Sequence, residues 1–202
     1  RFMDSLRHGI GHYPGFASLF RVDLSLSTEA VVPGYDLQQY EVKLNELAKG
    51  EYDIVFAFTE RRHYDPIVYH TIKTVLLGNG IPCQVMDSET VSVSPQQLRW
   101  VVSNVALSSY AKVGGTPWVI DGQDQAEVVL GMSRAVDEVK QVYVGFTTIF
   151  KHNGDYVLSY CKSPVRKWDD YEQGLEDMVR EAISEYEKRE GAVTSLVVHL
   201  SL

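Results

Sequence analysis

The chain has 202 residues, 45% of them hydrophobic, and a formal net charge of −8. This length allows one large core or two small ones, at about 100–150 residues per domain. The negative charge excludes a generic nucleic-acid coat, because nonspecific affinity comes from Lys and Arg side chains that neutralise phosphates. Any nucleic-acid site must therefore be local.

No run of about 18 apolar residues is present, and the start at Arg1 lacks the apolar stretch of a secretion signal. We therefore expect a soluble, cytoplasmic protein with no membrane partner. Cys83 and Cys161 form no CxxC motif and have no histidine at ligand spacing. This predicts two ordinary buried thiols rather than a disulfide framework or a zinc site.

The first predicted elements are a helix over 36–49 and a strand over 53–59. Asp36 is suited to cap the helix and Gly50 to end it. The apolar run at 53–59 is typical of a central parallel strand covered on both faces. The helix has one apolar stripe, formed by Leu37, Tyr40, Leu44 and Leu47.

A strand–helix–strand unit is predicted next. Asp65-Pro66 begins a helix that continues to Leu77, and residues 81–86 form another strand. Ligands of such βαβ units bind beyond the carboxyl ends of the strands. Ser94-Pro95 then begins a long helix through Lys112, which Gly114-Gly115 ends.

From Pro117 onward the pattern changes to strands, at 128–130, 142–150 and 156–160, with an Asn153-Gly154 hairpin turn. A helix at 169–190 and a strand at 195–200 follow, which is compatible with the opening half of an RNase H-like sheet. The acidic residues of that helix are typical of a solvated face. Its predicted apolar stripe is Tyr171, Leu175, Met178, Ile183 and Tyr186.

The most specific pattern lies at 104–118. Asn104 precedes Lys112 by eight residues, and Gly-Gly-Thr-Pro-Trp follows. The segment resembles the junction between the MID and PIWI domains of Argonaute proteins, here of the prokaryotic type. Upstream, Tyr69, Lys73 and Gln84 resemble the first three members of that family's Tyr, Lys, Gln, Lys pocket for a guide 5′-phosphate, with Lys112 as the fourth.

The spacing is also physically sensible. Tyr69 and Lys73 are four residues apart on a predicted helix and therefore project from one face. Lysine supplies charge and tyrosine a ring on which a base can stack. Each residue alone is ordinary surface, but together with the junction they indicate a phosphate pocket, which Asn104 and Ser108 would support.

The resemblance implies an α/β chain with a Rossmann-like MID domain at 35–115 and the first part of an RNase H-like PIWI domain at 116–202. Residues 1–34 form a lead-in segment that carries only a faint similarity, at His8-Gly9-Ile10 and Tyr13-Pro14-Gly15. A PIWI domain is expected to continue past Leu202, so we expect the chain to be part of a longer protein.

The implied function is binding of a guide RNA or DNA that recognises a complementary target strand, in host defence, with an effector protein encoded alongside as partner. An active guide-directed endonuclease is the first alternative. The second is a protein-interaction or small-molecule module on a Rossmann-like scaffold, because a fold alone does not fix function.

Cutting by an RNase H-like site needs carboxylates that hold two divalent ions. The family places its first aspartate two residues after a glycine on the opening strand, where this chain has Ser133. The strand at 197–202 offers no carboxylate for the second. We therefore expect no nuclease activity and assign His199 no role. Asp121 and Asp137 are the alternative ligands if this register is wrong.

A metal ion is expected at the guide phosphate. Eukaryotic-type pockets carry a further lysine four residues before the last one, and this chain has Ser108 there. Mg²⁺ or Mn²⁺ would supply the missing charge, held by Gln84 and the phosphates. The alternative is that Ser108 packs or bonds to its own helix while water screens the phosphate.

Overall fold

The computed structural model describes residues 1–27, 29–32, 36–60, 66–119, 127–137, 142–161, 165 and 168–200. The chain forms two compact units, Arg1–Pro117 and Trp118–Leu202. Residues 1–34, a lead-in segment by sequence, belong to the first unit. Among the described residues, no helix combines the length and the apolar character that a membrane span requires.

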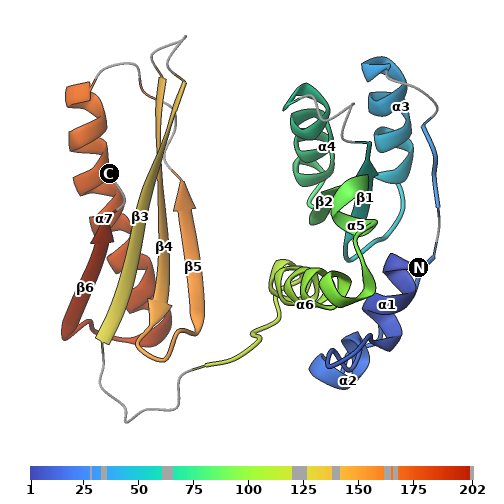
Figure 1. The fold of residues 1–202 in the computed structure, drawn as a ribbon. Coiled ribbons are helices and arrows are strands. Elements are labelled where there is room, and N and C mark those ends of the chain that lie inside the picture. The colour runs from blue at the N-terminus through green and yellow to red at the C-terminus, as the bar shows by residue number, and fades with distance from the viewer. Residues whose placement is uncertain are drawn as a thin grey trace. The chain divides into compact units, whose positions relative to one another are not determined.

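A parallel pair of strands forms the centre of the first unit. β1 (Val55–Thr59) and β2 (Cys83–Asp87) run in parallel, and α4 (Pro66–Gly78) connects them. α3 (Leu37–Leu47) lies beside α4 (Figure 1). The predicted strand–helix–strand unit is therefore confirmed, and the carboxyl end of β2 is followed by a short helix, α5 (Ser88–Val91).

The local signals for this unit are largely confirmed. Asp36 caps α3, since its carboxylate accepts a hydrogen bond of 2.9 Å from the backbone N–H of Gln38. Asp65 lies outside the described residues. The prediction that β1 is covered on both faces is wrong: Phe58 is 46% exposed, because in the described part of the chain this sheet has only two strands.

The N-terminal segment packs on the long helix α6 (Pro95–Lys112). It contributes α1 (Phe2–His8) and α2 (Phe16–Phe20), and the Tyr13 hydroxyl donates a 2.8 Å hydrogen bond to the carbonyl of Leu6. This segment is therefore part of the scaffold that holds α6. The shared core consists of Phe2, Leu6, Tyr13, Phe16, Met86, Leu98, Val102, Val105 and Ala106.

The second unit is a four-stranded sheet with one helix. β3 (Glu127–Asp137), β4 (Val142–Lys151) and β5 (Tyr156–Cys161) are antiparallel, β6 (Ser195–Leu200) is parallel to β3, and the order is β5-β4-β3-β6. α7 (Trp168–Glu190) lies on one face of this sheet (Figure 1). This confirms the predicted hairpin, helix and further strand.

The predicted turn and the packing of α7 are explained by a few residues. Gly154 has a φ of 85°, which suits glycine, and Asn153 accepts a hydrogen bond of 3.0 Å from the backbone N–H of Asp155. Gly145 lets α7 approach the sheet, since a Cβ there would lie 3.0 Å from Cε of Met178.

Two predictions for this unit are wrong. Ile183 is not in the core of α7, where Met178 and Ala182 are buried instead. The buried residues follow the three-to-four-residue repeat of the helix, since Ala182 comes four residues after Met178. Cys161 is exposed, because it ends the edge strand β5, whereas Cys83 is buried as predicted.

Candidate nucleic-acid interface

Lys73 is fixed against the start of β2. Its ammonium donates a 2.8 Å hydrogen bond to the backbone carbonyl of Cys83 and lies 5.6 Å from the centre of the Tyr69 ring. That distance is within the range of a cation–π contact. Tyr69 and Lys73 thus share one face of α4, as their spacing predicts.

Gln84 joins β2 to α6. Its side-chain oxygen accepts hydrogen bonds from the Lys112 ammonium and, at 3.3 Å, from the Ser108 hydroxyl. Because a lysine ammonium only donates, the Gln84 atom facing it must be the oxygen. The amide nitrogen of Gln84 therefore points elsewhere, and its two N–H donors make no hydrogen bond to the described residues.

The two lysines of this cluster influence each other. Burial of the Lys112 ammonium lowers its pKa, and the nearby positive charge of Lys73 lowers that pKa further. Within the described ranges, no carboxylate forms an ion pair with either lysine. Two cations held together without an anion raise the free energy of the unliganded protein, and a bound anion relieves that repulsion.

The end of α6 places Lys112 with a well-defined cap. The N–H of Gly115 donates to the Tyr110 carbonyl at 2.9 Å and the N–H of Gly114 to the Ala111 carbonyl at 3.1 Å, the two bonds of a Schellman motif. Gly114 has a φ of 87°. A Cβ at Gly115 would lie 2.4 Å from the Tyr110 ring. Both glycines of the junction motif are therefore required by geometry.

The structure brings together Tyr69, Lys73, Gln84, Ser108 and Lys112. Asn104, the remaining predicted residue, lies on α6 one turn before Ser108, with its side chain exposed. The Cys83 carbonyl that holds Lys73 was not predicted, because a backbone acceptor leaves no signal in the sequence.

Gln84 does not fit the expected role of a metal ligand. An amide binds Mg²⁺ or Mn²⁺ through its oxygen, and that oxygen already accepts from Lys112 and Ser108. A divalent ion there would also face the two lysine charges. The described residues contain no cluster of three or more His, Cys, Asp or Glu side chains suited to a metal.

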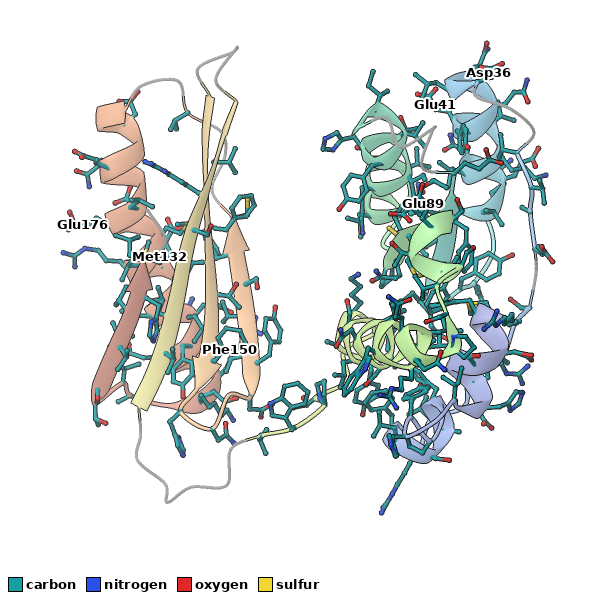
Figure 2. The ribbon with its side chains drawn as sticks, viewed as in Figure 1. Asp36, Glu41, Glu89, Met132, Phe150 and Glu176 are labelled. Atoms are coloured by element: carbon teal, nitrogen blue, oxygen red, sulfur yellow. The ribbon has the colours of Figure 1, made fainter. Side chains whose placement is uncertain are left out.

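In the second unit, Ser133 lies on β3 with its side chain exposed, two residues after Gly131. His199 on β6 pairs with Gly131 and is also exposed. Asp137 is the last residue of β3, and Asp121 and residues 201–202 lie outside the described residues. The acidic side chains of α7 whose burial is described are exposed or half-buried. Glu176, for example, points away from the sheet (Figure 2) and pairs with Arg180 at 2.8 Å.

The βαβ unit and the sheet of order β5-β4-β3-β6 define an α/β protein with an RNase H-like domain, and the lysine cluster is a candidate anion site. The model of the Piwi domain matches residues 53–201. The chain belongs to the Piwi domain family.

Two curated relatives agree. An argonaute protein of Cereibacter sphaeroides is 31% identical over 209 residues, which cover 91% of this chain and 26% of that protein. A Piwi protein of Archaeoglobus fulgidus is 24% identical over 143 residues, 68% of this chain and 32% of that protein. The chain therefore spans about a quarter to a third of the length of these relatives.

Solved structures support the fold. The crystal structure of Drosophila Piwi matches with a TM-score of 0.77 and 16% identity, covering 98% of this chain and 26% of that chain. The Argonaute of Marinitoga piezophila, solved with a 5′-OH guide RNA, matches with a TM-score of 0.51 and 12% identity, covering 77% of this chain and 25% of that chain.

Proposed function

We propose that this chain holds the 5′-phosphorylated end of a guide strand, RNA or DNA, for recognition of a complementary target. The observation that carries the proposal is the convergence of Lys73, Lys112 and the amide of Gln84, without a carboxylate partner for either lysine among the described residues. A phosphate dianion would lie between the two ammonium groups, accept from the Gln84 amide, and leave the first base over Tyr69.

The 5′ group is the variable to test, because the Marinitoga Argonaute was solved with a 5′-OH guide. Fluorescence anisotropy would compare otherwise identical 5′-phosphate and 5′-OH strands. Lys73→Ala or Lys112→Ala removes a charge-assisted bond of about 1.5–3 kcal/mol, so affinity for the phosphorylated strand should fall about tenfold or more. Equal losses for both strands would contradict the proposal, and micromolar or weaker binding of every strand would favour the protein-interaction alternative.

We further propose that the chain does not cut nucleic acid. Ser133 at the position of the family's first aspartate supports this, since a hydroxyl supplies no charge to a two-ion site. Incubation with guide, complementary target and Mn²⁺ should give no site-specific cleavage, and Ser133→Asp alone should restore none. Cleavage by either protein would favour the endonuclease alternative. A role in host defence with an effector partner rests on the prokaryotic family resemblance.

Without Gln84 as a ligand, the proposal of a divalent ion at the bound phosphate rests only on the need to neutralise the phosphate charge. Chelation tests it: EDTA at fixed ionic strength should weaken binding of the phosphorylated strand if the ion contributes, and Ser108→Lys should then reduce that sensitivity. Binding unchanged by EDTA would leave the two lysines as the source of neutralisation.

A further inference from the structure

Trp100 is a large aromatic side chain that α6 presents to solvent. It is 65% exposed, and the guanidinium carbon of Arg99 lies 5.2 Å from its ring centre. The stem of Arg99 is itself held, because it lies against Gly11, where an added Cβ would be 3.4 Å from Cδ of Arg99. A cation therefore lies over the indole, and at that exposure much of the ring surface remains open.

Trp100 continues the ridge of α6 that carries the candidate pocket. Trp100, Asn104, Ser108 and Lys112 follow one another at intervals of four residues, the spacing at which helix side chains form a continuous ridge. The ridge turns about 40° with each step of four residues, so Trp100 lies about 18 Å along the axis and about 120° around the helix from Lys112. Between them, Asn104 is exposed and makes no hydrogen bond from its side chain to the described part of the chain.

We propose that Trp100, together with Arg99, is a second nucleic-acid subsite, on which an unpaired base stacks several nucleotides from the 5′ end. This inference rests on the proposed function of the lysine pocket. A helically stacked strand advances about 3.4 Å per nucleotide, so about five nucleotides span the axial distance, the turn around the helix adds to this number, and an extended strand needs fewer. Asn104 lies where the intervening backbone would pass.

The surroundings favour a nucleic acid over a protein partner. The exposed residues near Trp100 on the same helix are Gln96, Gln97 and Asn104, so the indole is not part of a wider apolar patch on α6. An aromatic face beside an arginine is the combination that binds single strands, by stacking and by attraction to the backbone. In a chain of net charge −8, such a local cation is needed to bring a polyanion to this surface.

The test is a length series of 5′-phosphorylated strands, from a mononucleotide to about ten nucleotides, with Trp100→Ala, Trp100→Phe and a control. Trp118 provides the control: its indole is 67% exposed, and it lies outside α6. Trp100→Ala should lower the affinity for strands long enough to reach Trp100 about fivefold or more, and should leave the affinity for the mononucleotide unchanged. Trp100→Phe should lose less affinity for the long strands, and Trp118→Ala should change neither the affinity for long strands nor that for the mononucleotide.

A direct readout complements the affinities. With Trp118 and Trp168 replaced by Phe, the remaining Trp100 fluorescence should be quenched by long strands but not by the mononucleotide. A loss in Trp100→Ala that is equal at all lengths, or matched by Trp118→Ala, would overturn the proposal. If the wild-type protein does not prefer 5′-phosphorylated strands, the proposed phosphate pocket is wrong. A length-dependent loss of affinity in Trp100→Ala would in that case still support stacking at Trp100.

Discussion

Two clusters of positive charge, one in each unit of this chain, differ in whether they have carboxylate partners. In the second unit, Lys151 pairs with Glu190 at 2.6 Å, and Lys188 and Arg189 both pair with Glu185. In the first unit, Lys73 is close enough to Lys112 for its charge to lower the pKa of Lys112, and neither lysine has a carboxylate partner among the described residues. These cations of the second unit are already neutralised by their carboxylate partners. The lysine cluster of the first unit has a lower free energy when an anion is bound.

The pKa values show the same contrast. The hydrogen bond to Glu190 raises the pKa of Lys151, and burial together with Lys73 lowers that of Lys112. The net charge of the whole chain gives no indication of this difference, because it sums both units. In an acidic protein, a candidate anion site is therefore found by identifying the cations that lack carboxylate partners.

Gln84→Glu should make the first unit resemble the second, and we expect this to be the largest effect. The new carboxylate would keep the size of the side chain, pair with Lys112 and repel a phosphate. The binding preference for 5′-phosphate over 5′-OH strands should fall about tenfold or more, since a charge-assisted donor is replaced by a like charge. Anisotropy with the paired strands measures it.

The reciprocal change is the control. Glu190→Gln removes the carboxylate beside Lys151 and should leave guide affinity unchanged, with a loss in unfolding free energy of at most about 1 kcal/mol, because both side chains are partly exposed. An unaltered phosphate preference in Gln84→Glu would mean that the strand end binds away from this cluster.

The second prediction concerns the scaffold of the first unit. Gly115→Ala places a methyl group against the ring of Tyr110, which is stacked on Phe20 at 4.2 Å and is therefore not free to move away. We expect the free energy of unfolding to fall by about 1–3 kcal/mol, as for other overpacked sites. Urea denaturation measures this.

Gly154→Ala in the second unit is the matched control for that scaffold change. It has a φ of 85° but nothing within 4 Å of an added Cβ. It should cost only the backbone strain, about 1 kcal/mol. An equal loss of unfolding free energy in Gly115→Ala and Gly154→Ala would show that the Tyr110 ring moves aside and that its close contact with Gly115 does not fix the end of α6.

Much of this architecture was predictable, because its signals are local. The Asp36 cap, the Asn153-Gly154 turn and the glycines after Lys112 each determine a boundary through their own backbone geometry. The order of Tyr69, Lys73, Gln84 and Lys112 was recognisable from resemblance, and the structure places the four side chains in one cluster.

What could not be predicted depends on contacts between distant segments. No periodicity in residues 1–34 indicates that Phe16 and Phe20 pack on Tyr110. Likewise, the sequence does not reveal that the oxygen of Gln84 accepts hydrogen bonds from Lys112 and Ser108, which argues against Gln84 as a metal ligand. Side-chain orientation in a site is decided by tertiary neighbours.

The smallest expected effect is a pH dependence of the phosphate preference. The pKa of Lys112 is lowered from its ordinary value of 10.5, first by burial and then by Lys73. Between the lowered pKa and 10.5, the unfolded chain binds more protons than the folded one, so Lys112 makes stability rise with pH in that window. Binding has the opposite sign, because a phosphate dianion favours the protonated lysine and the complex therefore holds more protons than the free protein.

The affinity ratio of 5′-phosphate to 5′-OH strands should thus fall several-fold as pH rises from about 7 toward 10, because the charge-assisted bond of Lys112, about 1.5–3 kcal/mol, is lost only in part. The phosphate itself does not contribute, since its second pKa of about 6 keeps it dianionic throughout. DNA strands of adenine and cytosine avoid both alkaline hydrolysis and base ionisation. Lys112→Arg retains its charge over the whole range and should give a flat ratio. A ratio that falls equally in Lys112→Arg would assign the titration to another group and would show that the low pKa of Lys112 is not coupled to the bound strand end.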